Sequence, residues 1–167
     1  MHLDNDDITK GVDFSDLKFN KKSNMKIAIV AARFNADIVD QMIKGSKQAL
    51  LGNGLSEEQI DIFRVPGAFE LPLAVKNCAK SKKCDGIIAL GAVIRGDTDH
   101  YVYVCTETTR GLMKVMLKEN IPVALGVLTT ENIEQAMIRA DINRENKGSE
   151  VTLSLLEMIN LIPKILN

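Results

Sequence analysis

The feature that most constrains the fold is a regular alternation of short apolar runs with longer segments whose apolar residues recur at helical spacing. The apolar runs are 26–32, 60–65, 85–94 and 122–128. The helical segments are 37–52, 70–80, 101–115, one that ends near 140 with its N-cap in 129–131, and a last one after 141–147. Pro163 is expected to end or kink this last helix. Such alternation predicts right-handed βαβ units and a parallel sheet with helices on both faces.

Two of the runs contain so few polar residues that both faces of the strand should be covered. These runs are 85–94 and 122–128, and continuous apolar sequence is typical of buried strands in parallel sheets. Residues 25–167 should therefore form one three-layer α/β/α sandwich with a central four-stranded parallel sheet, flavodoxin-like in type. Residues 1–24 lie outside the pattern and are expected to form an extension, with an edge strand or an inter-subunit arm at 12–19 and mobile chain elsewhere.

The charge and apolar content exclude several classes of protein. The chain has 167 residues, with 21 basic and 22 acidic side chains, so it lacks the basic excess that nucleic acid or an anionic membrane surface attracts. Its apolar runs are much shorter than the roughly 20 residues that span a bilayer. The N-terminus is acidic and polar where a secretory signal would be basic and then apolar, so we expect a cytoplasmic protein. Cys78, Cys84 and Cys105 lack metal-ligand spacing and are expected to be reduced thiols without a metal.

The candidate site lies in the loops that follow the strands, because ligands of open parallel sheets bind beyond the carboxyl ends. After the first run, Phe34 can stack on a flat ligand or can plug the end of the core. After the second, Gly67 allows close approach of the backbone, and the amides that follow are free donors at the start of a helix. Glu70 either accepts hydrogen bonds from ligand hydroxyls or stabilises the positive end of the helix dipole.

The third loop, 91–100, has the densest cluster of polar groups in the chain. It ends at His100, which Asp97 and Asp99 precede; the imidazole acts as a proton shuttle or is a solvated residue at a helix start. After the fourth run, Arg139 and Lys147 are either phosphate ligands or solvated charges. The residues thus predict a stacking ring, amide donors, one proton shuttle and phosphate cations, but they name no substrate.

Five motifs together resemble a known family. They are Arg-Phe-Asn at 33–35, Val-Pro-Gly-Ala-Phe-Glu-Leu-Pro at 65–72, the segment 91–100, Gly-Val-Leu-Thr-Thr at 126–130 and Asn-Lys-Gly at 146–148. In order and spacing they resemble the 6,7-dimethyl-8-ribityllumazine synthases of riboflavin biosynthesis, over about residues 26–166. The resemblance implies a cofactor-free transferase that condenses 5-amino-6-(D-ribitylamino)uracil with 3,4-dihydroxy-2-butanone 4-phosphate, releasing phosphate and water.

The resemblance also implies a role for each matching residue. His100 would shuttle protons, and Phe34 would stack on the pyrimidine. The other contacts to the pyrimidine and ribityl chain would be Ala68, Phe69, Glu70, Ala92, Val93, Ile94 and Leu125, and the phosphate substrate would lie near Asp97, Thr98, Arg139 and Lys147. Since the family's site lies between subunits, Leu125 and Arg139 should come from the neighbouring chain.

Three positions depart from the family pattern. Leu125 stands where phenylalanine is frequent, Val102 where an acidic residue usually follows the histidine, and Asp141 where glycine is common. The missing acid puts the efficiency of proton transfer by His100 in question, and Asp99 is the residue that would compensate.

The family assembles as pentamers, and in many members twelve pentamers close into a shell, so we expect a homo-oligomer with riboflavin synthase as a candidate partner. Two alternatives from other classes remain at this point, a cage or storage protein and a paralogue that binds lumazine or flavin without making it. The presence of His100 and Arg139 argues against a pure binding protein.

Overall fold

The computed structural model describes residues 12–19, 24–144 and 146–167. Its strands are β1 (Ile27–Ala32), β2 (Ile60–Val65), β3 (Gly86–Ile94) and β4 (Val123–Thr130). Its helices are α1 (Ala36–Gly52), α2 (Leu71–Ser81), α3 (His100–Glu119), α4 (Ile133–Ala140) and α5 (Lys147–Leu166), with short 3₁₀ turns η2 (Glu57–Gln59) and η3 (Ala68–Glu70). All strand pairs are parallel, in the order β2-β1-β3-β4.

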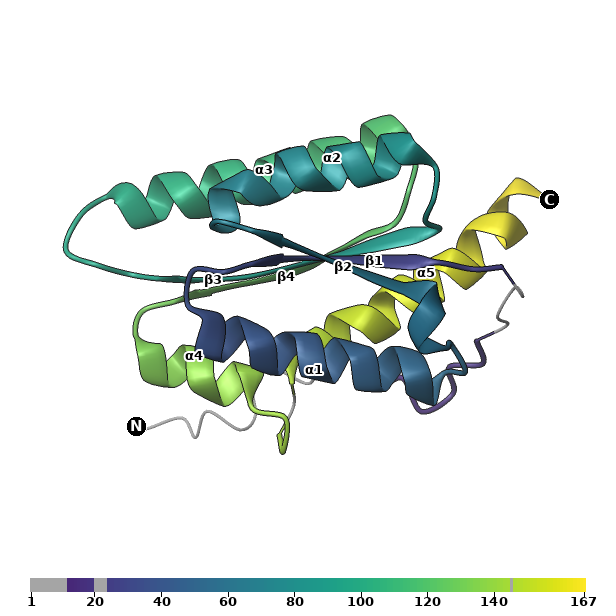
Figure 1. Cartoon of the computed structure of the whole chain (residues 1–167), viewed down its shortest axis with the longest axis horizontal. Coiled ribbons are helices and arrows are strands. Elements are labelled where there is room, and N and C mark those ends of the chain that lie inside the picture. Colours follow the sequence, from purple (N-terminus) through teal and green to yellow (C-terminus); the bar gives the residue numbers. More distant parts are fainter. Residues whose placement is uncertain (1–11, 20–23, 145) are drawn as a thin grey trace, which may run out of the picture.

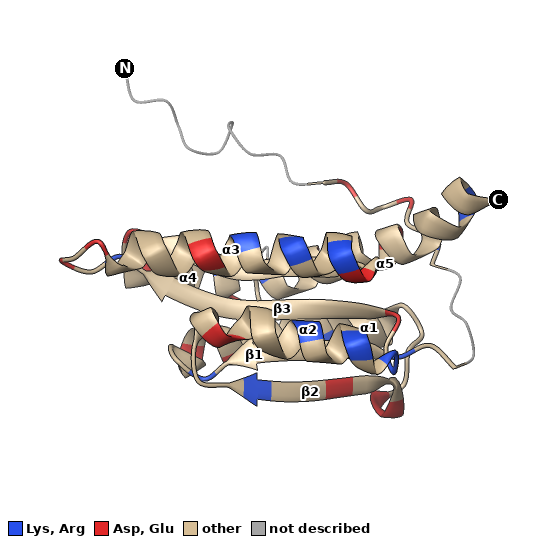
Figure 2. Cartoon of the chain, turned by 90° about the horizontal axis from the view of Figure 1, so that it is seen from above, with Lys and Arg blue, Asp and Glu red and all other residues tan. Residues whose placement is uncertain are grey.

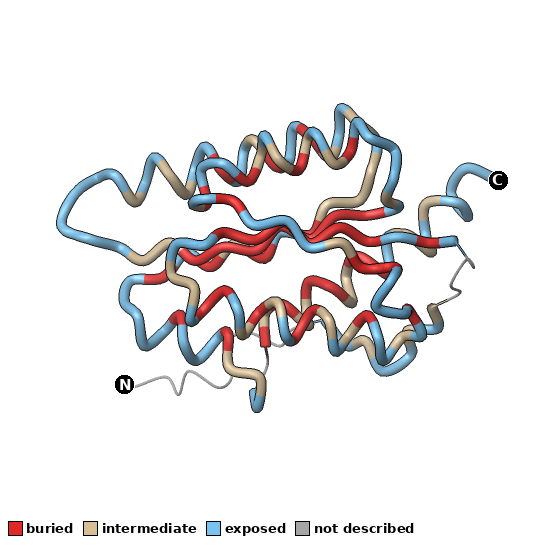
Figure 3. Tube along the Cα trace, viewed as in Figure 1, coloured by how far each residue is buried: buried red, intermediate tan, exposed pale blue. Residues whose placement is uncertain are grey.

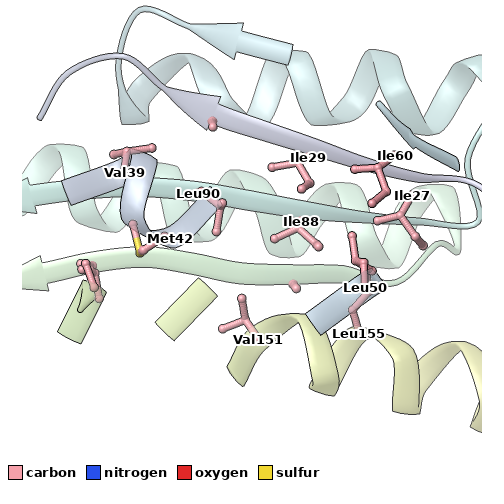
Figure 4. Packing of buried hydrophobic residues seen from close by; sticks show 14 of the residues in the cluster. Ile27, Ile29, Val39, Met42, Leu50, Ile60, Ile88, Leu90, Val151 and Leu155 are labelled. Carbon is pink, nitrogen blue, oxygen red and sulfur yellow. The ribbon is translucent and has the colours of Figure 1, made fainter. Parts of the chain in front are cut away.

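The helices form a layer on each face of the sheet, as the alternating pattern predicted. Helices α2 and α3 cover one face, and α1, α4 and α5 cover the other (Figure 1). On the α1 side, Ile29 and Leu90 of the sheet pack among Met42 and Leu155 (Figure 4). Strands β1 and β3 are the most continuously buried part of the chain (Figure 3). The three-layer, flavodoxin-like architecture is thus confirmed.

The prediction that both faces of the fourth strand are buried is wrong. Strand β4 is the outermost strand beyond β3, and its residues alternate, with Ala124 and Leu128 buried and Leu125 45% exposed. An edge strand has one neighbour only, and here the α2–α3 layer leaves part of its outer face open. The apolar run therefore marks a face that this chain alone does not bury.

One predicted helix boundary is also wrong, and at Pro163 one of the two predicted effects, the end of the helix, does not occur. Strand β4 continues to Thr130, so residues 129–131 do not cap α4; the Asn132 side chain does, accepting a hydrogen bond from Gln135 N at 2.9 Å. Pro163 does not end α5, which continues to Leu166. Proline removes one backbone hydrogen bond from a helix. Because only three residues of α5 follow Pro163, this loss affects the last turn alone.

The segment 12–19 contains no strand, so the prediction of an edge strand there is wrong, and the alternative of an inter-subunit arm stays a prediction. Leu17 and Phe19 instead pack against the core on the α1 side. The Asn160 side chain of α5 donates a hydrogen bond to the Lys18 carbonyl at 2.9 Å. The mobility expected for the rest of the extension concerns residues that largely lie outside the described ones.

Charged residues are interspersed along the helices rather than gathered on one element (Figure 2). None of the helices in the described part of the chain is long and apolar enough to cross a membrane.

Candidate functional site

The strand order places a topological switch point between β1 and β3, where successive connections leave in opposite directions. Ligands of such sheets bind at this point, beyond the carboxyl ends of the strands. The backbone extends the pairing of β1 with β2 into the loops: Arg33 N donates to the Val65 carbonyl at 2.8 Å and Phe34 N to the Pro66 carbonyl at 3.0 Å. Phe34 is thereby held beside the loop that follows β2.

Asn35 links the same loop to β3. Its backbone is left-handed, with φ of 57°, a conformation that asparagine tolerates better than most residues. Its side-chain amide donates to the Ala92 carbonyl at 2.8 Å. Phe34 therefore stands between the ends of β2 and β3, with its residue surface 70% exposed.

The turn after β2 is fixed from two sides. Glu70 Oε2 accepts a hydrogen bond from Gly67 N at 2.9 Å, so the carboxylate caps η3. The buried Thr108 of α3 donates its hydroxyl to the Ala68 carbonyl at 3.2 Å. Of the two explanations for Glu70, the structure shows the local capping contact, and a contact with ligand hydroxyls stays a prediction.

These loops enclose one side of an open cavity of about 570 Å³, a volume typical of small-molecule sites. The cavity brings together most of the residues proposed from the sequence: Phe34, Ala68, Phe69, Glu70, Ala92, Val93, Ile94, Thr98 and His100. Sequence reasoning missed Tyr101, Tyr103 and Val104, which complete the wall from the first turn of α3. Their positions one, three and four residues after His100 are a signal that could have found them, because such residues cluster on or beside one helix face.

His100 begins α3 at the end of the exposed β3–α3 loop, the long connection at the left of Figure 1. Its backbone N–H donates to Thr98 Oγ1 at 3.4 Å. Within the described residues, the imidazole forms no ion pair with Asp97 or Asp99. Asp97 is exposed in the loop and does not line the cavity.

Beside His100, burial raises the pKa of the Tyr101 hydroxyl, and the Cys105 thiol raises this pKa further. Burial likewise raises the pKa of Cys105. Both groups therefore stay protonated at neutral pH. No group of three His, Cys, Asp or Glu side chains in the described part of the chain is placed to hold a metal ion.

Besides Asp97, three of the proposed residues do not line the cavity. Leu125 lies on β4, in a separate apolar hollow with Leu117, and Arg139 lies in the last turn of α4, in the layer on the opposite face of the sheet from α3. Lys147 forms an ion pair with Glu150 at 2.6 Å. Within one chain, therefore, the cavity has aromatic rings, backbone donors and an imidazole but not these two basic side chains.

A cavity at the switch point of a flavodoxin-like sheet, lined by exposed aromatic rings and one imidazole, is typical of an α/β protein with a small-molecule site. The chain belongs to the 6,7-dimethyl-8-ribityllumazine synthase family, whose model matches residues 24–163.

Relatives with the name 6,7-dimethyl-8-ribityllumazine synthase match over most of their length. The protein of Campylobacter lari is 51% identical over 144 residues, which are 86% of this chain and 92% of the relative. That of Campylobacter jejuni strain RM1221 is 52% identical over 144 residues, 86% of this chain and 94% of the relative. The Halorhodospira halophila protein is 49% identical over 140 residues, 84% and 90% of the two chains.

Proposed function

We propose that this chain condenses 5-amino-6-(D-ribitylamino)uracil with 3,4-dihydroxy-2-butanone 4-phosphate to give 6,7-dimethyl-8-ribityllumazine, phosphate and water. The observation that carries the proposal is the single cavity in which Phe34, the 67–70 turn and His100 meet. Its chemistry suits a planar heterocycle whose amine must be brought to a carbonyl. The reaction proceeds through imine formation, elimination of phosphate and ring closure, and the transfer of protons accompanies each step.

The pyrimidine is assigned to the inner part of the cavity. Phe34 stacks on its face, and Ala68, Phe69 and Glu70 with Ala92, Val93 and Ile94 hold its edge and the ribityl chain. The hydrogen bond from the Thr108 hydroxyl to the Ala68 carbonyl supports this assignment. Because a trans peptide is planar, the N–H of Phe69 points away from that carbonyl and so away from α3. The first N–H groups of a helical turn lack intrahelical partners and are available as donors to a ligand.

The phosphate substrate is assigned to the outer part of the cavity, near Asp97 and Thr98, with His100 between the two substrates as the proton shuttle. Arg139 of a neighbouring subunit supplies the phosphate clamp, and Leu125 of that subunit covers the pyrimidine. Two features support a shared site: Arg139 forms no ion pair within the described residues, and Leu125 lies on an exposed apolar edge. Lys147 is a weaker phosphate ligand, because Glu150 already pairs with it.

The first experiment mixes the purified chain with both substrates and follows lumazine formation by absorbance. We expect product above the spontaneous background, and a reduced rate for the folded Arg139→Ala variant. A folded oligomer that binds the pyrimidine without accelerating the reaction would be a binding or shell protein, and the proposed activity would be wrong.

A second experiment tests the shared site by co-expression of His100→Ala chains with Arg139→Ala chains. If each site combines His100 of one subunit with Arg139 of the next, random mixing in a ring restores about a quarter of the sites. The mixed oligomer should then be faster than either variant alone. A mixed rate equal to the average of the two variants would place both residues in one chain's site.

The assembly proposed is a homo-oligomer of pentamers, with a shell of twelve pentamers as its largest form and riboflavin synthase as a partner, in the cytoplasm. Residues 25–167 form the catalytic domain, and residues 1–24 are an extension of it. Light scattering separates a pentamer from a shell of sixty subunits, and it does so without reference to activity.

A further inference from the structure

The β3–α3 loop holds His100 with few contacts of its own. Residues 95–100 are all exposed, and His100 N to Thr98 Oγ1, at 3.4 Å, is a long hydrogen bond. A loop of this kind opens locally more easily than the core does. A side-chain contact must therefore restrain the start of α3 if the imidazole is to keep one position over the cavity.

Arg95, the first residue of this loop, makes the contacts that can restrain it. Its backbone N–H donates to the Thr130 carbonyl at 2.9 Å, which fastens the loop to the end of β4. Its side-chain Nε lies 2.7 Å from Glu131 Oε2. Its guanidinium carbon lies 4.3 Å from the centre of the Tyr101 ring, a cation–π contact.

These contacts connect both ends of the loop. Glu131 lies between β4 and α4, so it gives the guanidinium a fixed anchor on the sheet side, while Tyr101 directly follows His100 in the first turn of α3. The Arg95 side chain thus links the first residue of the loop to Tyr101, which follows the last residue of the loop. Arg95 itself does not line the cavity, so its role differs from that of a substrate ligand.

We propose that Arg95 is a positioning residue, which holds the imidazole of His100 over the cavity by bridging Glu131 and the ring of Tyr101. The inference rests on the proposed role of His100 as proton shuttle. Arg95 contributes little to global stability, because exposed ion pairs are weak, but it restricts the loop to one arrangement, and small displacements of a catalytic group lower turnover strongly.

The test is a kinetic cycle between Arg95→Gln and His100→Ala in the full-length chain, with kcat and KM measured for each substrate. We expect Arg95→Gln to lower kcat about tenfold in the wild-type background, with both KM values nearly unchanged. In the His100→Ala background the same change should lower kcat less than about threefold, because a residue that acts through His100 has nothing left to position. Glu131→Gln should resemble a milder Arg95→Gln.

Arg95→Lys keeps the charge and the cation–π contact but loses Nε, so it should lie between wild type and Arg95→Gln; it also serves if Arg95→Gln does not fold. The matched control is Arg110→Gln, which removes an arginine paired with Glu107 at 3.5 Å on α3, outside the cavity, and should leave kcat unchanged.

Three results would overturn the proposal. The first is an equal loss of kcat from Arg95→Gln in the wild-type and His100→Ala backgrounds, and the second is no loss of kcat in either. The third is a raised KM for the phosphate substrate with kcat unchanged, which would make Arg95 a substrate ligand. If His100→Ala alone retains full kcat, the proposed proton shuttle fails, and the positioning role fails with it. In the first three cases His100→Ala still lowers kcat, so the two failures are distinguishable.

Discussion

Replacement of Phe34 by alanine separates a stacking role for this ring from a role in plugging the core. Full burial of such a side chain contributes roughly 1.5–3 kcal/mol to the free energy of unfolding. Because Phe34 is 70% exposed, its removal should cost about a third of this, or about 0.5–1 kcal/mol. Stacking of a base on an aromatic ring is worth about 1–3 kcal/mol. This corresponds to a rise of about 5- to 150-fold in KM for the pyrimidine.

The assay is steady-state kinetics with each substrate varied in turn, together with urea unfolding. The KM for the phosphate substrate should change little. Phe63→Ala is the matched control, because Phe63 on β2 is 47% exposed and lies outside the cavity; it should lower stability by a similar amount and leave KM unchanged. A large loss of stability in Phe34→Ala, with the KM for the pyrimidine unchanged, would refute the stacking role.

His100→Ala should retain measurable turnover, with a loss near the low end of the roughly 10²- to 10⁴-fold range of acid–base catalysis or below it, since positioning of reactants supplies most of the acceleration; a folded variant without activity would contradict this. Arg139→Ala should raise the KM for the phosphate substrate about ten- to hundredfold, for a charge-assisted contact of about 1.5–3 kcal/mol, and unchanged saturation would exclude Arg139 as the clamp. Gly148→Ala should lower the free energy of unfolding by about 1–3 kcal/mol in urea, because a Cβ there meets the Met42 carbonyl at the crossing of α1 and α5. Burial raises the pKa of Cys84 to about 11, above the ordinary 9.0, so stability should fall as the pH rises from about 9 to about 11, where the unfolded thiol ionises first; a Cys84→Ser chain should lose this part of the decline.

The sequence predicts the sheet well because burial and pattern agree there. Strand β3 has apolar residues on both faces, and it lies between two other strands under two helical layers. Strand β4 has the same kind of sequence and lies at the edge. Periodicity reports which residues avoid water but not what covers them, so it cannot distinguish a central strand from an edge strand whose open face is apolar.

The candidate site, too, could be predicted from the sequence only in part. Phe34 and His100 were predictable, because the carboxyl ends of parallel strands meet at one edge of the sheet. The contact of Arg95 with Glu131 was not, since it depends on how far β4 extends past the sheet and on the course of the β3–α3 loop. The apolar spacing indicated a helix after His100, but it did not indicate that Tyr103 would line the cavity.

Two features that one chain leaves unexplained, an exposed apolar edge and an arginine without an ion pair among the described residues, involve the residues that the proposed shared site takes from a neighbouring chain. Leu125 and Leu117 are 45% and 72% exposed in the hollow beside β4, although an apolar surface of this kind is normally covered in a stable protein. Arg139 lies well apart from the cavity that would need a phosphate ligand. A neighbouring copy that covered the β4 edge would bury the leucines and bring basic and apolar side chains toward a cavity at once. The co-expression of His100→Ala with Arg139→Ala therefore examines the fold and the chemistry together, because restored activity requires that each site be built from two chains.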